Sequence, residues 1–277
     1  MTHKQQLFQR FPIDGSVVVA GEESTTPYHI YNGTILSLGG TVDGKVAARF
    51  LAAENLEPVL DTDGRALAAI WICDFTEANL DAHHELQISL FATRHKEQPL
   101  RADAFSFYRA LKLIPDLMMV CHGLWNNTQR VVRYNSEHLL LNARLTKSEV
   151  VFSGDYWTFR FRDAAGGLIA EGSVQATRRQ PASVGWKIAR QMGLRGFLNL
   201  LKAPFFKLPV VNTRRQGEDC NHVCTTYTVC EKPLIRAATN KDFIAISEAN
   251  YAELDFRITF VQVLKDIGFI FMRPTPL

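Results

Sequence analysis

The chain has 277 residues, 47% of them hydrophobic and 21% charged, with a formal net charge of +3. This composition suits one large domain or two small ones with a substantial core. No apolar run reaches the roughly 18 residues that a membrane-spanning helix needs, which argues against such a helix. The five cysteines are odd in number and irregularly spaced, as is typical of reduced thiols. Because the first residues lead into no apolar stretch of the signal-peptide kind, we expect a soluble cytoplasmic protein.

Short β-rich runs follow one another along most of the chain. The first, at residues 29–38, ends in Gly39-Gly40, which we interpret as a turn. Helical spacing at residues 104–114 predicts a helix that Pro115 ends. Many short strands interrupted by two helical insertions favour an antiparallel barrel or sandwich. The other predicted strands lie at residues 65–75, 85–93, 117–125, 137–145, 149–152, 156–162, 168–177, 222–230, 234–238 and 256–264.

One stretch, from Gly172 to Gly217, contains no acidic residue and nine lysines or arginines, which leaves the rest of the chain acidic. Apolar residues at about 184–201 recur with helical spacing and predict a basic amphipathic helix with one broad apolar face. For residues 178–215 we favour a lid or packing role, with a membrane surface, an acidic carrier protein or a dimer contact as alternatives. Aromatic residues on the apolar face are not placed for base stacking, so we expect no nucleic-acid partner.

Residues 134–144 read YNSEHLLLNAR. This segment resembles the catalytic segment of acetoacetate decarboxylases, in which a Gly-Arg-Glu-like opening leads through apolar residues to a pair of lysines. The first of those lysines forms a Schiff base with the substrate ketone. On the simplest register Ala143 stands in its place and Arg144 in place of the second. Because alanine cannot form an imine, the resemblance implies the family's fold without its namesake reaction, unless a gap brings Lys147 forward.

Further segments carry the same resemblance. Residues 54–59 (ENLEPV) are similar to the family's Pro-x-x-Leu-x-Pro turn, and residues 69–72 and 85–88 resemble its next two strands. Residues 145–176 resemble the hairpin after the catalytic segment. The resemblance implies a single domain over residues 1–277, with a core of about 25–265 and a helical insertion at about 180–208. The expected fold is mainly β: an antiparallel β-barrel that encloses a ligand cavity, with helices near 103–114 and 184–201.

Glu85 is the candidate catalytic residue. The resemblance places the family's arginine at about Gly33 and one of its two acids at about Ile70, whereas the other acid is kept as Glu85. Strict alternation puts Glu85 and Gln87 on one face of a strand, which could line the cavity. A carboxylate there would have a raised pKa, as suits a general acid or base. The alternative is an ordinary strand whose polar face meets solvent.

Four residues are candidates for substrate binding: Gln87, Glu137, Ala143 and Arg144. Glu137 would share a strand face with Ala143 and point into the cavity, and its alternative is a structural hydrogen-bond partner. The guanidinium of Arg144 suits a substrate carboxylate, and its alternative is a surface arginine beside Lys147.

Two groups of histidines and cysteines were weighed as metal sites. Cys220, His222 and Cys224 alternate on one predicted strand face, but their spacing is not a usual zinc pattern. The second group joins the 83–85 segment (HHE) to His122 and His138. Neither supports a named metal, so we predict no metal and no cofactor.

Two functions from different classes follow. The first is a cofactor-free, lyase-like enzyme that acts on a hydrophobic keto acid or polyketide-like molecule through Glu85. Its reaction would be a dehydration, a cyclisation, an aldol-type step or a decarboxylation without an imine. The second is a non-catalytic barrel that binds a hydrophobic anion, at a membrane surface in one version. Both take a small hydrophobic acid or ketone as ligand, and we expect a homo-oligomer.

Overall fold

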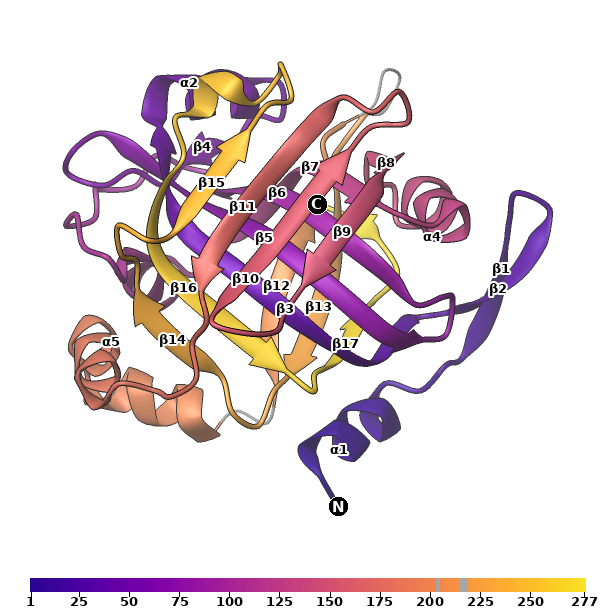
Figure 1. Cartoon of the computed structure of the whole chain (residues 1–277), viewed down its shortest axis with the longest axis horizontal. Coiled ribbons are helices and arrows are strands. Elements are labelled where there is room, and N and C mark those ends of the chain that lie inside the picture. Colours follow the sequence, from indigo (N-terminus) through magenta and orange to yellow (C-terminus); the bar gives the residue numbers. More distant parts are fainter. Residues whose placement is uncertain (203–204, 215–218) are drawn as a thin grey trace.

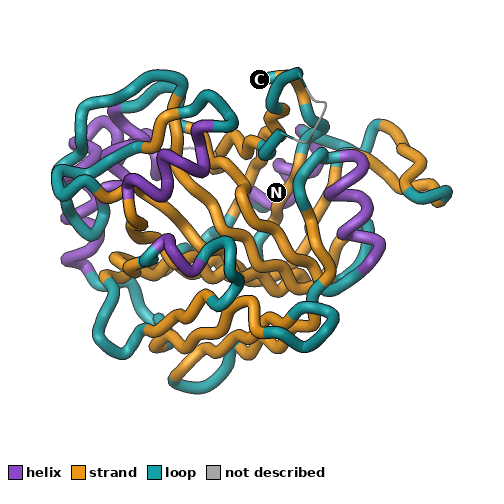
Figure 2. Tube along the Cα trace, turned by 90° about the horizontal axis from the view of Figure 1, so that it is seen from above, coloured by secondary structure: helices purple, strands orange, loops and turns teal. Residues whose placement is uncertain are grey.

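The computed structural model describes residues 1–202, 205–214 and 219–277 (Figure 1). Strands dominate, and a large curved sheet occupies the centre of the molecule, which confirms the mainly β prediction (Figure 2). Within the described residues, the pairings of this sheet pass through seven strands and return to the first. In this order the strands are β3 (Tyr28–Asp43), β5 (Arg65–Ala78), β6 (His83–Thr93), β7 (Met118–Asn126), β12 (Phe206–Val211), β13 (His222–Val229) and β17 (Gly268–Phe271).

Within the described chain, five further strands extend this sheet, and two of its pairings are parallel. The added strands are β4 (Glu57–Pro58), β8 (Ala143–Leu145), β14 (Leu234–Ala237), β16 (Arg257–Lys265) and β18 (Thr275–Pro276). Strand β16 pairs with β3 and carries β14 on its other edge. Strands β8 and β12 both run parallel to β7. The expectation of a wholly antiparallel sheet is therefore wrong.

A second sheet forms a separate layer over the first (Figure 2). Apolar side chains fill the space between the two sheets, including Leu86 and Ile88 from β6 and Trp157, Phe159 and Phe161 from the second sheet. This layer covers the outer face of the main sheet, so the inner face is left for a cavity. Its strands, in spatial order, are β15 (Phe243–Ile246), β11 (Leu168–Gln175), β10 (Tyr156–Arg162) and β9 (Lys147–Val151).

A hairpin and several helices complete the fold. Strands β1 (Gly15–Val19) and β2 (Glu22–Thr26) form a hairpin that projects from the body (Figure 1). Helices α3 and α5 confirm the two predicted helical insertions. The helices are α1 (His3–Arg10), α2 (Gly44–Ala52), α3 (Ser106–Leu113), α4 (Gln129–Arg133), a π-helix (Tyr134–His138), α5 (Ala182–Lys202) and a 3₁₀-helix (Ala252–Leu254).

Helix α5 differs from its prediction in two ways. Gly193 breaks the helix into two parts. Its φ of 70° and ψ of 163° form a backbone conformation that glycine adopts readily. Its apolar residues also do not share one face, because Trp186 and Leu194 are exposed while Val184 and Ile188 are buried. The kink changes only the direction of the second part. Trp186 and Ile188, which both precede it, point in opposite directions because residues two positions apart lie about 200° from each other around a helix.

Gly39 and Gly40 do not form a turn, and that prediction is wrong. Both lie inside β3, opposite β16. A Cβ on Gly39 would meet the ring of Phe260 at 2.1 Å, and one on Gly40 would meet the carbonyl oxygen of Arg257 at 2.1 Å. The glycines therefore allow β16 to approach β3 closely.

The strand predicted at residues 137–145 is also wrong over most of its length. A π-helix occupies Tyr134–His138, and only Ala143–Leu145 is a strand. Leu140 has a φ of 60°, which interrupts any extended run. Leu139 and Leu141 are nevertheless fully buried, so their apolar character reports packing rather than strand alternation.

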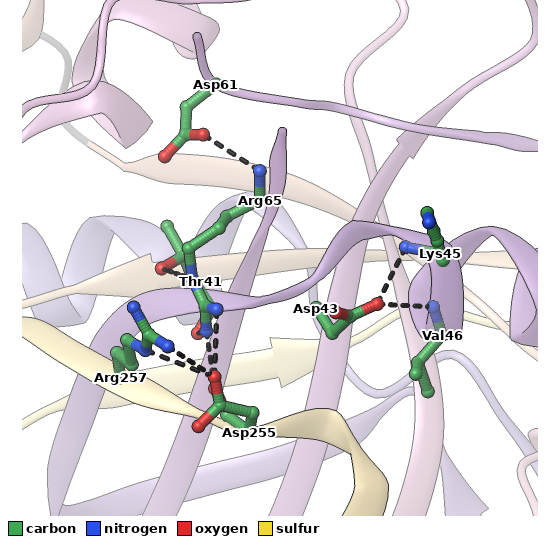
Figure 3. A network of polar contacts seen from close by, with 8 residues as sticks. All are labelled: Thr41, Asp43, Lys45, Val46, Asp61, Arg65, Asp255 and Arg257. Carbon is green, nitrogen blue, oxygen red and sulfur yellow. Dashed lines mark hydrogen bonds and ion pairs between the residues drawn. The ribbon is translucent and has the colours of Figure 1, made fainter. Parts of the chain in front are cut away.

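A polar network holds one end of the main sheet together (Figure 3). Arg65 at the start of β5 donates from Nε to Thr41 Oγ1 and from Nη1 to Asp255 Oδ2, both at 2.9 Å. Asp43 ends β3 and caps α2, because its Oδ1 accepts the backbone N–H groups of Lys45 and Val46 at 2.9 Å each. These contacts fix the ends of the two strands that flank the cavity wall.

No helix in the described part of the chain is both long enough and apolar enough to cross a membrane.

Candidate functional site

A cavity of about 440 Å³ lies on the inner face of the main sheet. All seven strands of the returning series contribute side chains to its wall, together with α3, α5, β14, β16, His3 of α1 and the loop after β13. Most of these side chains are aliphatic or aromatic, as is usual for pockets that bind small organic molecules. The polar lining groups on the strands and on α3 are Trp71, Cys73, Glu85, Gln87, Tyr108, Thr226, Thr228 and Gln262.

Strand β6 places Glu85 and Gln87 in this wall, as the alternation of its residues indicated. Leu86 and Ile88 point the other way, into the core beneath the second sheet. Gln87 is held in place, since its Nε2 donates to Ser89 Oγ at 2.6 Å. The solvent-facing alternative for this strand is therefore wrong.

The Glu85 carboxyl group has one donor among the described side chains. Asn126 Nδ2 on the neighbouring strand β7 donates to Glu85 Oε2 at 2.9 Å. Burial raises the pKa of Glu85 to about 7, and the hydrogen bond from Asn126 offsets part of that rise. Near neutral pH the group therefore exists in both protonation states, as a general acid or base requires.

A second asparagine orients the first. Asn135 Nδ2 donates to Asn126 Oδ1 at 3.0 Å, so the amide of Asn126 must turn its N–H toward Glu85. Both asparagines are fully buried, and Asn135 lies in the π-helix. Within residues 134–144, then, Asn135 supports Glu85 from behind the cavity wall. Sequence reasoning missed both asparagines, because nothing in the local pattern links them to Glu85.

Two further polar groups on the cavity wall lack a partner in the described structure. The hydroxyl of Tyr108 and the indole Nε1 of Trp71 are buried and form no hydrogen bond. Burial raises the pKa of Tyr108, so its hydroxyl stays protonated and can donate. An unpartnered buried donor costs free energy that a bound oxygen acceptor would recover. Tyr108 lies in the helix predicted at 104–114, but its missing partner cannot be inferred from spacing.

Two buried thiols, Cys73 and Cys121, lie near the carboxyl group, and a third, Cys224, is buried elsewhere in the same core. Burial raises the pKa of Cys73 and of Cys121 well above the ordinary thiol value, and the nearby Glu85 carboxylate raises each further. Burial also raises the pKa of Cys224 to about 12. These thiols are protonated at neutral pH and are not nucleophiles in that state.

The structure does not bring the other predicted binding residues to the cavity. Glu137 is exposed, and its Oε2 accepts the backbone N–H of Ala20 at 3.0 Å. Ala143 pairs with Leu124 at the edge of the sheet and is not in the cavity wall. Glu137 does not share a strand face with Ala143, because a π-helix replaces the predicted strand.

The side chain of Arg144 lies on the face of the main sheet that points away from the cavity, beside Trp125 of β7. Its guanidinium stacks over the Trp125 ring at 4.5 Å, and its Nη1 forms an ion pair with Glu248 Oε1 at 3.1 Å. Arg144 is thus outside the cavity wall, and its described partners are Trp125 and Glu248 rather than a neighbouring Lys147. Lys147 is exposed on β9 in the second sheet, and no described lysine lines the cavity.

Two of the candidate metal ligands, His83 and Cys224, have other contacts. His83 Nδ1 lies 2.9 Å from the carbonyl oxygen of Asp81, and burial lowers its pKa to about 4. The thiol of Cys224 donates to the Leu139 carbonyl oxygen at 3.5 Å. Among the described residues, no group of three or more His, Cys, Asp or Glu side chains could hold a metal ion.

Comparison with solved structures identifies the fold. An acetoacetate decarboxylase from Legionella pneumophila superposes with a TM-score of 0.63 and 11% identity, over 98% of this chain and 94% of that one. A second acetoacetate decarboxylase gives a TM-score of 0.57 and 9% identity, over 91% and 89%. The enduracididine biosynthesis enzyme MppR, complexed with pyruvate, gives 0.53 and 14%, over 91% and 90%.

The chain therefore has the fold of acetoacetate decarboxylase-like enzymes, which confirms the resemblance seen in residues 134–144 at the level of fold. Searches with protein-family models and against curated proteins found no match. At identities of 9–14% the structural likeness carries the fold alone. The chemistry has to be argued from the cavity.

Proposed function

We propose that the chain is a cofactor-free enzyme in which Glu85 is the general acid or base acting on a carbonyl compound bound in the cavity. The observation that carries this proposal is the buried carboxyl group of Glu85, whose pKa of about 7 matches the pH at which proton transfer would occur. Perturbed groups of this kind cluster at functional sites.

An enclosing barrel is part of the proposal. The pairings that return from β17 to β3, and the wall residues supplied by all seven strands, support a closed barrel with its ligand inside. Such enclosure excludes water, which raises the pKa of a carboxyl group and strengthens hydrogen bonds to a reacting oxygen.

The donors on the wall suit an enolate. Glu85 would remove a proton from the carbon beside a carbonyl, and the electron pair of the broken C–H bond would move onto the carbonyl oxygen. The hydroxyl of Tyr108 and the indole N–H of Trp71, both without another partner, would stabilise that oxygen. Protonated Glu85 then returns the proton to carbon or to a leaving hydroxyl group. When a hydroxyl group leaves, the outcome is a dehydration. In an aldol-type step or a cyclisation the enolate carbon instead forms a C–C bond to a second carbonyl carbon, and protonated Glu85 gives its proton to the new alkoxide oxygen.

The charges on the wall favour a neutral ketone over a keto acid. No arginine or lysine is among the described residues that line the cavity, whereas Glu85 is. A substrate carboxylate would therefore face two acids, Glu85 and Glu231, with no lysine or arginine among the described lining residues to balance the charges. The missing lysine also supports a route without a Schiff base. MppR binds pyruvate, which is a keto acid, so this neighbour supports a carbonyl compound as the ligand class but not the preference for a neutral one.

Hydrogen–deuterium exchange tests the proposal without the true substrate. Hydrophobic methyl ketones of graded length would be incubated with the protein in D₂O, and loss of the α-proton signal followed by NMR. We expect Glu85→Gln to slow the exchange about 10²- to 10⁴-fold, the usual contribution of a general base. Binding of the ketone, followed by calorimetry, should change little. Glu77→Gln, an exposed carboxylate at the end of β5, is the matched control.

Two outcomes would contradict the proposal. Equal exchange by the wild type and Glu85→Gln would favour the second candidate, a barrel that binds a hydrophobic ligand without transforming it. The apolar wall and its unpartnered donors would serve that function as well. A covalent adduct on any lysine after borohydride reduction would restore the Schiff-base route.

A further inference from the structure

Helix α5 presents apolar side chains in two opposite directions. Val184, Ile188 and Met192 are buried, and Ile188 reaches the cavity wall. On the outside, Trp186 is 79% exposed and Leu194 is 71% exposed. The helix lies at the edge of the molecule beside β14 (Figure 1). It also packs on α3. Large exposed apolar side chains gathered on one element are typical of an interaction surface.

Cations line a cleft on the side of α5 that meets α3. A cleft of about 450 Å³ between α3 and α5 is lined by Arg101, Arg109, Lys187 and Arg190. None of the four forms an ion pair with any described residue. The acid in the same cleft, Asp103, is engaged locally, because its Oδ1 accepts the backbone N–H of Phe105 at 2.9 Å. The cleft thus carries an excess of positive charge.

Charge and apolar groups alternate along the outer side of α5. Trp186 and Arg190 are one helical turn apart and therefore adjacent on its surface. Beyond the kink, Leu194 and Leu198 are likewise one turn apart, with Arg195 between them. We refer to Trp186, Leu194, Leu198 and the four cleft cations as the α3–α5 face.

We propose that the α3–α5 face docks on an anionic phospholipid bilayer. Trp186, Leu194 and Leu198 enter the interfacial layer, and the four cations of the cleft bind headgroup phosphates. Tryptophan with leucine beside lysine and arginine is the composition of helices that lie in a membrane interface. Charge complementarity decides for an anionic surface, since four cations line the cleft against one described acid, Asp103. This inference is independent of the chemistry at Glu85.

Fluorescence of Trp186 gives a direct readout of docking. Trp125 and Trp157 are buried and Trp71 is half-buried, so aqueous iodide quenches mainly Trp186. The full chain would be titrated with vesicles of phosphatidylcholine alone or mixed with phosphatidylserine. We expect the mixed vesicles to bind the protein and protect Trp186 from iodide, and high salt to release it. Phosphatidylcholine vesicles should protect it weakly or not at all.

Two variants separate the charged from the apolar contribution. Lys187→Gln/Arg190→Gln should lower the partition coefficient about 30-fold, because each cation near the surface contributes about a factor of five. Leu194→Ser/Leu198→Ser should lower it on the order of tenfold or more. Lys45→Gln/Arg133→Gln removes two exposed cations from α2 and α4 and should leave it unchanged. Circular dichroism would show that each variant is folded.

Three results would overturn the proposal: no binding to the mixed vesicles at low salt, binding with no protection of Trp186, or an equal loss of affinity in the control variant. The first would leave the face to an acidic protein partner. The second would show that another surface docks. The third would show attraction by net charge alone.

Discussion

Two shielded carboxylates in this molecule have opposite electrostatic environments. The carboxylate of Asp242 accepts hydrogen bonds from both terminal nitrogens of Arg236 at 2.6 Å. It also accepts hydrogen bonds from the backbone N–H groups of Thr239 and Gln175. Burial acts to raise its pKa, but these hydrogen bonds outweigh burial and lower it. Glu85 has the single donor Asn126, and burial raises its pKa to about 7. The number and charge of the donors, rather than burial alone, decide the sign of each shift.

The difference separates a structural acid from one suited to chemistry. Asp242 and Arg236 join β14 of the main sheet to the end of β11 in the second sheet, so their pairing holds two layers together. The carboxyl group of Glu85 does not connect the two sheets and faces a cavity instead. A protein gains no stability from a carboxyl group kept in that state, which is the expected sign of a group retained for function.

The largest effect should come from breaking the structural pair. Arg236→Met leaves the carboxylate of Asp242 shielded without its cation, which should lower the free energy of unfolding by about 3–5 kcal/mol. Urea unfolding at neutral pH measures this. Arg160→Met, which removes an exposed ion pair with Glu171 in the second sheet, should cost under about 1 kcal/mol. Similar losses in both variants would mean that Asp242 is not a structural acid of the kind described.

Removing the carboxyl group of Glu85 should have a somewhat smaller effect of opposite sign. Between pH 4.5 and about 7 the unfolded chain releases the Glu85 proton while the folded chain keeps it. The contribution of this group to stability is therefore complete below pH 4.5 and is lost as pH rises through 7. Glutamine does not titrate. Between pH 4 and pH 8 the free energy of unfolding of Glu85→Gln should therefore rise by about 3 kcal/mol relative to that of the wild type.

Urea unfolding across this pH range is the measurement, with Asp242→Asn as the contrast. The lowered pKa of Asp242 means that its contribution is present above its unfolded value of 3.8 and is lost only as pH falls. Asp242→Asn should therefore leave the slope between pH 5 and pH 8 as in the wild type. If Glu85→Gln has the same slope as the wild type, Glu85 has an ordinary pKa and the proposed chemistry loses its main support.

The sequence predicts those features that depend on neighbouring residues. Strand β10 was predicted at its observed bounds, since its residues alternate between buried and exposed. The same alternation placed Glu85 and Gln87 on the face that lines the cavity. Strands β12 and β17 were missed, because β17 has only four residues and neither shows clear alternation of polar and apolar residues.

Features that depend on distant partners could not be predicted. The pair Gly39-Gly40 predicts a turn when only neighbouring residues are considered. In the structure β16, more than 200 residues away in sequence, packs on these glycines. Segment 134–144, which lacks a lysine, was expected to form part of the cavity wall. It contributes Asn135 instead, which donates a hydrogen bond to Asn126. A hydrogen bond between a strand and a π-helix has no local signal, so neither asparagine was a candidate.

The smallest effect tests this asparagine pair. Asn126 donates to the charged form of Glu85, so Asn126→Leu should raise the pKa of Glu85 by about one further unit. Carbon-13 NMR of labelled glutamate follows the titration directly. Asn126→Leu alone leaves the Asn135 amide without its acceptor, and the double variant Asn126→Leu/Asn135→Leu removes both groups together. The pKa shift should be the same in both variants, while the single variant should be the less stable. An unchanged pKa in both would show that burial alone sets the protonation of Glu85 and that the π-helix has no part in it.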